Sequence, residues 1–252
     1  MLVIFSNIWC VNFFILKLKN RGKETTINLV EKIDNLVTVK NILVSVSDKS
    51  GLDKFVPQLI KINPDLSILS TGGTFDYLRG ILGTTASDRH LVQVSDYTGQ
   101  PETQGGLVKT LDFKIYLGLL TETYNPSHQA DLQRTNASAI DMVIVNFYPF
   151  SETITKPDVT PEMARGNIDI GGPCMLRASA KNYHRVSSIV DPMDYPQIIK
   201  ELESTGGKTT LKTRFELMKK VFFHTSKYDS AIYDYLYRMS YKKIIDAYPV
   251  IV

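Results

Sequence analysis

Short apolar segments alternate with segments of helical spacing after residue 40, and this alternation limits the possible folds more than any other feature. The β-branched run Asn41–Ser47 predicts a buried strand, and apolar residues spaced as on a helix follow at 52–60. Leu66–Leu69 predicts a second strand and Phe75–Leu82 a second helix. Elements that alternate in this way form a parallel sheet with crossover helices. The predicted class is therefore α/β, a parallel sheet flanked by helices.

The rest of the chain continues this pattern. Further strands are predicted at Leu91–Val94, 114–120, Asp141–Pro149 and Val186–Val190, and further helices at 127–137, Met175–Lys181, Tyr195–Ser204 and 209–240. Residues 95–106 are rich in glycine, proline and polar residues, which is typical of an exposed functional loop.

The segment Ser70-Thr71-Gly72-Gly73-Thr74 follows the second predicted strand and is the first candidate for a ligand site. Glycines let a ligand approach the backbone, and the start of the next helix offers N–H groups to an anion. Ser45, Ser47 and Lys49 follow the first strand, and neighbouring parallel strands end at the same edge of a sheet. We therefore predict a phosphate cradle. The alternative is an ordinary Gly-Gly turn capped by Thr74.

Other polar residues stand where strands end or helices begin. Lys109 follows a glycine-rich loop, and its alternative role is that of a solvated surface lysine. Asn146 and Tyr148 close an apolar strand, where they either cap the strand or face a ligand. Asp169 precedes a helix whose dipole suits its charge. Together with Lys181 it also resembles a catalytic carboxylate that faces an amine.

The composition excludes several classes of protein. The net charge of +3 is small and the basic residues are scattered, which argues against a nucleic-acid-binding protein. The two cysteines, Cys10 and Cys174, and the four histidines show no metal-ligand spacing, so we expect no metal site. Reduced thiols in a cytoplasmic protein are the simpler interpretation of two distant cysteines.

The N-terminus differs from the rest of the chain. Residues 1–16 carry no charge, are mostly apolar and are followed by basic residues, the reverse of a secretory signal. They are also shorter than the roughly 20 residues that span a bilayer. A membrane-contacting segment, a targeting segment and an extension without a folded role remain possible, and we favour the extension. The expected organisation is an extension and polar linker at 1–40, an α/β domain at 41–240 and a tail at 241–252.

Taken together, these motifs resemble the inosine monophosphate cyclohydrolase domain of the bifunctional purine-biosynthesis proteins. They occur in family order and cover roughly residues 41–238. The motifs are Ser45-Val-Ser-Asp-Lys-Ser-Gly51, Ser70-Thr-Gly-Gly-Thr74, Gly106-Leu-Val-Lys-Thr110, Asn146-Phe-Tyr-Pro-Phe150, Ile168-Asp-Ile-Gly-Gly172, Leu176-Arg-Ala-Ser-Ala-Lys-Asn182 and His224-Thr-Ser-Lys-Tyr-Asp229. The resemblance implies a fold like that of methylglyoxal synthase and a homodimer.

The resemblance also implies the last step of purine synthesis, in which a formylated carboxamide ribotide closes to inosine monophosphate without a cofactor. Residues that would bind the nucleotide are Ser45, Ser47, Lys49, Thr71, Gly72, Gly73, Thr74, Thr110, Asn146, Ile170 and Gly171. Among the residues that would act in catalysis, Asp169 would accept the amide proton. Lys109, Lys181 or Tyr148 would stabilise or protonate the formyl oxygen.

The chain departs from the family pattern between residues 107 and 116. Leu107 stands in place of an arginine, Asp112-Phe113 in place of His-Pro, and Tyr116 in place of a second histidine. A leucine cannot replace the donors of a guanidinium. A nucleotide-binding or regulatory module with weakened catalysis is therefore the main alternative to an active enzyme, and methylglyoxal synthase is a weaker third. In the family a transformylase domain follows, whereas this sequence stops at Val252. We therefore expect the transformylase activity to be absent.

Overall fold

The computed structural model describes the chain except for residues 1–18, 21–22, 25–28, 102–108, 149 and 252. The chain divides into two compact units, residues 1–31 and residues 32–252. In the first unit, strands β1 (Lys19–Asn20) and β2 (Lys23–Glu24) pair in antiparallel fashion. The second unit contains the α/β fold.

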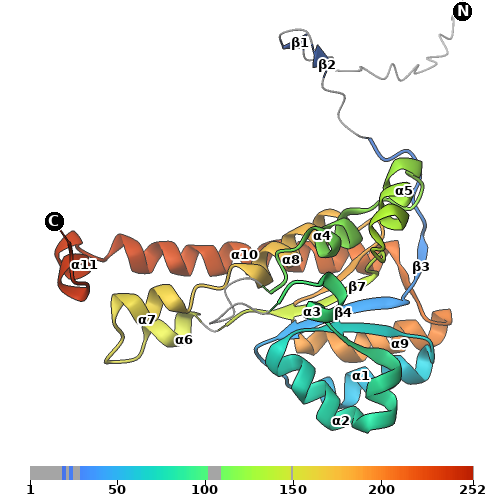
Figure 1. The fold of residues 1–252 in the computed structure, drawn as a ribbon, viewed down its shortest axis with the longest axis horizontal. Helices are drawn as coiled ribbons and strands as arrows, with labels where there is room; N and C mark the ends of the chain where they lie inside the picture. Colours follow the sequence, from blue (N-terminus) through green and yellow to red (C-terminus); the bar gives the residue numbers. More distant parts are fainter. Residues whose placement is uncertain (1–18, 21–22, 25–28, 102–108, 149, 252) are drawn as a thin grey trace, which may run out of the picture. The chain divides into compact units, whose positions relative to one another are not determined.

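A five-stranded parallel sheet forms the centre of the second unit (Figure 1). The strand order is β6 (Leu91–Gln93), β5 (Ser67–Ser70), β4 (Asn41–Val46), β7 (Met142–Asn146) and β8 (Ser187–Ile189). All four neighbouring pairs are parallel. The α/β class predicted from the alternation of strands and helices is thus confirmed.

Helices connect these strands and continue beyond them. They are α1 (Leu52–Ile62), α2 (Gly72–His90), α3 (Val94–Thr98), α4 (Phe113–Leu120), α5 (Pro126–Thr135), α6 (Phe150–Ile154), α7 (Pro161–Gly166), α8 (Gly171–Lys181), α9 (Tyr195–Thr205), α10 (Leu211–Tyr237) and α11 (Tyr241–Ala247). A 3₁₀ turn, Pro192–Asp194, precedes α9. Within the described part of the chain, no helix is both long and apolar enough to cross a membrane.

The central strand β4 supplies side chains to two hydrophobic cores, because successive residues of a strand point to opposite faces. Ile42 and Val44 pack in one core with residues of α1 and α9, such as Phe55 and Ile198. Leu43 packs in the other core with residues of α4 and α8. Figure 1 shows α1, α2 and α9 below the sheet and α4, α8 and α10 above it. Both faces of the sheet are therefore covered, as a parallel sheet requires.

Residues 114–120 form a helix, α4, and the strand predicted there is wrong. Asp112 lies at the N-cap of this helix, and its carboxylate accepts a hydrogen bond of 2.7 Å from the backbone N–H of Lys114. Ile115 and Leu119, four residues apart, are both fully buried. Their spacing is helical, and a capping aspartate just before it is the signal that favoured a helix.

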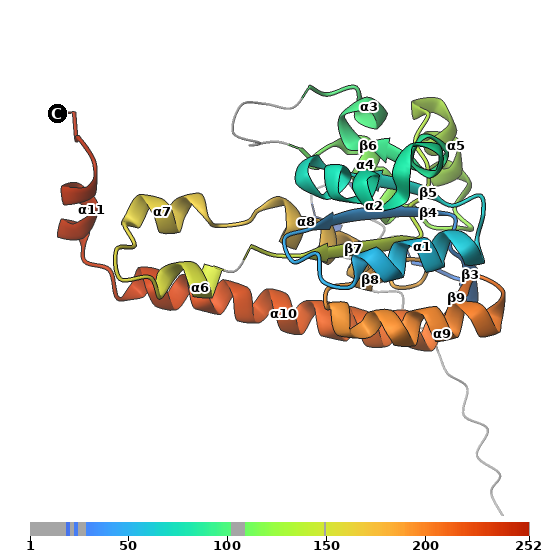
Figure 2. The ribbon, with the colours of Figure 1, turned by 90° about the horizontal axis from the view of Figure 1, so that it is seen from below.

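The segment expected to be a linker contributes structure of its own. Strand β3 (Leu36–Thr38) pairs in antiparallel fashion with β9 (Lys208–Thr210), which takes up the start of the helix predicted at 209–240. Val39 is buried in the core. At the other end of the chain, α6 and α7 lie along the C-terminal half of α10 (Figure 2), and α11 contacts α7.

A buried ion pair ties together the first residues of two central strands. The Arg185 Nη1 group donates to Asp141 Oδ1 at 3.0 Å, and Asp141 Oδ2 accepts the backbone N–H groups of Lys40 and Asn41 at 2.9 Å each. Burial raises the pKa of Asp141 and lowers that of Arg185, although each charge opposes the shift of the other. Each charge therefore depends on its partner.

We expect the Arg185→Met variant to lose about 3–5 kcal/mol of unfolding free energy, because Asp141 would remain as an uncompensated buried charge. The double variant Asp141→Asn, Arg185→Met should recover part of that loss. Urea denaturation followed by circular dichroism measures both values. A single variant as stable as the parent would contradict a structural role for the pair.

Candidate functional site

The carboxyl ends of β4, β5 and β7 open into a cavity of about 760 Å³. Its lining includes Ser45, Ser47, Lys49, Thr71, Gly72, Gly73, Thr74, Lys109, Thr110, Asn146, Tyr148, Asp169, Ile170 and Gly171. These are all of the residues proposed for the site from the sequence except Lys181. Residues from five separate stretches of the chain thus meet in one place.

The loops after β4 and β5 are joined by side-chain hydrogen bonds. The hydroxyls of Ser45 and Thr71 are 2.8 Å apart. The Thr74 hydroxyl accepts from the Val46 N–H at 3.1 Å and donates to the Val46 carbonyl at 3.0 Å. Gly72 begins α2 and supplies one of the first-turn N–H groups, which an α-helix leaves without internal partners. The two loops therefore form one rigid edge with N–H donors suited to an anion.

Asn146, the last residue of β7, braces the loop after β4. Its Oδ1 atom accepts the backbone N–H groups of Ser47 and Asp48 at 2.7 and 2.9 Å, and its Nδ2 atom donates to the Asp48 carbonyl at 2.8 Å. The side chain also lines the cavity. Both roles considered for it from the sequence, a structural cap and a cavity residue, are therefore present together.

Two glycines allow polar side chains to approach the backbone of the cavity wall. Gly72 has a φ of +42°, and a Cβ atom there would lie 3.0 Å from the Lys109 Nζ atom. A Cβ atom at Gly171 would lie 3.0 Å from the Thr110 hydroxyl. A side chain at either position would force the Lys109 amine or the Thr110 hydroxyl to shift.

Asp169 is partly buried at the start of α8. Its Oδ1 atom accepts the Gly172 N–H at 2.9 Å, and its own backbone N–H donates to the Tyr228 hydroxyl at 2.7 Å. Burial raises the pKa of Asp169, against the opposing effect of the N–H groups of Gly172 and Tyr148. Tyr228, on α10, was not predicted as a site residue, because it is 59 residues away in sequence. A raised pKa makes Asp169 a better proton acceptor than an exposed aspartate.

The charged side chains of the cavity wall are Lys49, Lys109, Arg165 and Asp169. Cations outnumber the single carboxylate, which suits an anionic ligand. Arg165, on α7, was missed at the sequence level because no motif surrounds it. Among the described residues, no group of three or more His, Cys, Asp or Glu side chains is placed to hold a metal ion.

Lys181 lies away from this cavity. It is the last residue of α8, while Gly171 at the first position lines the cavity, so the two are separated by roughly 15 Å along the helix axis. The Lys181 side chain is exposed and does not line the cavity. The expectation that Lys181 reaches into the pocket is therefore not met by the position of this residue within a single chain.

Two of the departures from the family pattern also lie outside the cavity wall. Asp112 is 4% exposed and caps α4. Tyr116 packs against the core above the sheet, where burial and the neighbouring Cys174 raise the pKa of its phenol. The third, Leu107, falls outside the described residues. Asp112 and Tyr116 therefore have structural roles and leave the described cavity wall intact.

Comparison with known families agrees with this arrangement. Residues 51–174 match the MGS-like domain, which defines the class of fold, and this match includes the loop after β5. Residues 179–250 match the AICARFT/IMPCHase bienzyme model, and this match includes α10 and α11. The chain therefore contains an MGS-like domain followed by a segment that matches the AICARFT/IMPCHase bienzyme model.

Individual relatives match most of this chain but only part of their own length. Over 198 residues it is 45% identical to the bifunctional purine biosynthesis protein PurH of Ruminiclostridium cellulolyticum, and over 203 residues 43% identical to that of Neisseria meningitidis. These alignments cover 79% and 81% of this chain but only 37% of each relative. A solved structure titled crystal structure of ForH superposes with a TM-score of 0.65 at 29% identity, covering 77% of this chain and 94% of ForH.

The geometry of the cradle predicts different effects for its two glycines. Gly72→Ala should cost about 1–2 kcal/mol of unfolding free energy, because its left-handed backbone disfavours a side chain. It should also weaken binding of inorganic phosphate at this edge, since the new Cβ atom meets the Lys109 amine. Gly73→Ala is the matched control, because a Cβ atom at Gly73 meets nothing within 4 Å. Calorimetric melting and titration measure the two effects, and equal behaviour of the variants would contradict the assigned backbone role.

Proposed function

We propose that this chain is an inosine monophosphate cyclohydrolase, which closes the second ring of 5-formamidoimidazole-4-carboxamide ribotide with loss of water. One observation carries the proposal. A single cavity combines two anion-suited loops with a lysine, a tyrosine and a carboxylate of raised pKa. The match of residues 179–250 to the AICARFT/IMPCHase bienzyme model supports the same reaction.

The loops after β4 and β5 would hold the 5′-phosphate, with Ser45, Ser47, Lys49 and the first turn of α2 as donors. The base would then extend toward Asp169 and Tyr148. This orientation holds the carboxamide and formyl groups of one substrate in register, which lowers the entropic cost of ring closure.

Ring closure requires the carboxamide nitrogen to attack the formyl carbon. As the new C–N bond forms, the nitrogen loses a proton and the electron pair of the formyl C=O bond moves onto its oxygen. Asp169 accepts the proton, since its carboxylate is partly desolvated and fixed by the Gly172 N–H. Lys109 or the Tyr148 hydroxyl stabilises and protonates the oxygen. The C–O bond of the tetrahedral carbon then breaks, and the hydroxyl takes up a second proton and leaves as water. The formamido nitrogen gives up its proton as the new C=N bond forms, which completes the aromatic ring.

A catalytically weakened nucleotide-binding module of the same fold is the second candidate. The observation in its favour is Leu107, which replaces a family arginine. Such a module would keep the phosphate loops and lack turnover. For either function we propose a cytoplasmic homodimer, as the resemblance implies.

An absorbance assay of inosine monophosphate formation tests the enzyme directly. Lys109→Ala and Asp169→Asn should each lower kcat by about 100-fold or more. The first removes a group that stabilises charge on the formyl oxygen, and the second removes the carboxylate that accepts the amide proton. Lys156→Ala, an exposed lysine outside the cavity wall, is the control and should keep full activity. Binding of inosine monophosphate without any turnover would instead establish the binding module, and Leu107→Arg would then test whether that residue is responsible.

The pH dependence of turnover follows from Asp169. Because its carboxylate must be ionised to accept a proton, kcat/KM should fall as the pH drops through the raised pKa of this group. The acid limb of the profile should therefore lie above the ordinary aspartate value of 3.8. The residual activity of Asp169→Asn should lack this limb. A limb that persists unchanged in that variant would exclude Asp169 as the base.

A further inference from the structure

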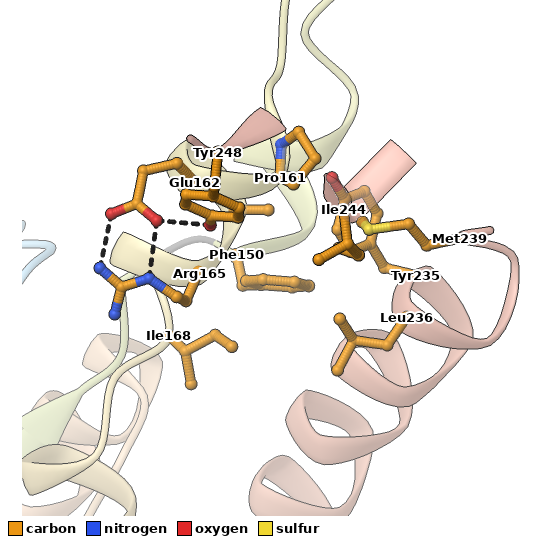
Figure 3. A pocket seen from close by; sticks show the side chains of 11 residues that line it. Phe150, Pro161, Glu162, Arg165, Ile168, Tyr235, Leu236, Met239, Ile244 and Tyr248 are labelled. Carbon is orange, nitrogen blue, oxygen red and sulfur yellow. Dashed lines mark hydrogen bonds and ion pairs between the residues drawn. The ribbon is translucent and has the colours of Figure 1, made fainter. Parts of the chain in front are cut away.

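A second cavity, of about 750 Å³, lies between α6, α7, α10 and α11 (Figure 3). Its wall is mostly apolar and is formed by Phe150, Pro161, Glu162, Ala164, Arg165, Ile168, Tyr235, Leu236, Met239, Ile244 and Tyr248. Phe150 and Ala164 are each 1% exposed, so the base of the cavity belongs to the packed protein. Its volume falls within the range of about 300–1,000 Å³ that small-molecule sites occupy.

One edge of this cavity is polar and exposed to solvent. Arg165 donates to Glu162 through Nε at 2.7 Å and through Nη2 at 2.5 Å. The Tyr248 hydroxyl donates to Glu162 Oε2 at 2.6 Å, and Figure 3 shows the three side chains meeting at that edge. These bonds fix the guanidinium and hold the end of the chain against α7. Of its five N–H groups, an arginine bound in this way uses two, so the others can serve a ligand.

Aromatic side chains define the chemistry of the interior. The rings of Phe150 and Tyr235 meet edge to face, with centroids 5.9 Å apart. Met239 adds a flexible thioether, which adapts to planar rings and contacts them favourably. An aromatic body therefore matches the interior better than an acyl chain, and an acidic group on that body would reach Arg165.

The two cavities share part of one wall. Arg165 and Ile168 line both the apolar cavity and the cavity at the sheet edge. Asp169, the proposed base, is the next residue after Ile168. A ligand that repositions Arg165 or Ile168 would therefore change the nucleotide pocket as well.

We propose that the apolar cavity is a second ligand site, for a small aromatic anion whose ring system packs against Phe150 and Tyr235 and whose acidic group pairs with Arg165. Occupancy of this site alters affinity for nucleotide through the shared wall. Only this coupling rests on the proposed function.

Two fluorescent dyes of the same aromatic body test the site on the intact chain. Anilinonaphthalene sulfonate carries an acidic group and N-phenyl-naphthylamine lacks it. Both should bind saturably with one dye per chain. Leu236→Trp should weaken both about tenfold or more, because the larger side chain fills the cavity from a position that is 51% exposed. Phe223→Trp, on the same helix, 55% exposed and outside the cavity wall, should leave both affinities unchanged.

Arg165→Gln separates the acidic group from the ring system. It should weaken the sulfonate dye about fivefold or more and leave the uncharged dye unchanged. Near-ultraviolet circular dichroism checks that each variant keeps its tertiary packing. Absence of saturable binding, equal binding to the Leu236→Trp variant, or equal loss of both dyes in Arg165→Gln would overturn the proposal.

The coupling is measured by the affinity of the sulfonate dye with and without saturating inosine monophosphate. Coupling free energies are reciprocal, so bound nucleotide should change the affinity for the dye by the same factor as bound dye changes the affinity for nucleotide. We expect the dissociation constant of the dye to change about fivefold or more. Complete displacement of the dye by nucleotide, or no shift at all, would overturn the coupling. A separate calorimetric titration with inosine monophosphate shows whether the nucleotide pocket binds at all. Failure of the proposed function is thereby distinguished from failure of the second site.

Discussion

The position of β4 between β5 and β7 is the constraint on which the rest of the site depends. In the parallel registers, Val44 lies beside Ser70 and Val46 beside Asn146, so the three strands end at one edge. Side chains then lock the loops that follow. Thr74 binds both backbone groups of Val46, and Asn146 binds the backbone of the next two residues. Because these partners are 28 and about 98 residues apart, the cradle exists only when the sheet is assembled.

Burial at this edge gives the cavity its chemical character. Asp169 is held at the start of α8 by the Gly172 N–H, while the surrounding protein removes enough water to raise its pKa. Lys109 lies against Gly72, a position that tolerates this approach because it has no side chain. A proton acceptor and a cation therefore face one cavity from different elements.

The long helix α10 links this cavity to the part of the fold beyond the sheet. Its Tyr228 hydroxyl accepts the Asp169 N–H, and its ring packs against Phe147 and Phe150. Further along the helix, Tyr235 lines the apolar cavity. Arg165 lines both this cavity and the cavity at the sheet edge. Changes in α10 can thus act on Asp169 through Tyr228.

The sequence by itself determined the sheet, the two phosphate-suited loops and most of the residues that line the cavity, because these depend on local period and on glycine and hydroxyl motifs. It misassigned α4, where a short apolar run satisfied both periods and the cap at Asp112 settled the outcome. The tertiary structure alone decided which distant residues meet. It placed Arg165 at the cavity, the Tyr228 hydroxyl against the backbone of Asp169 and Lys181 at the far end of α8. It also gave Asp112 and Tyr116 structural roles. The physical reason is that burial and long-range hydrogen bonds depend on packing between elements, which no local pattern contains.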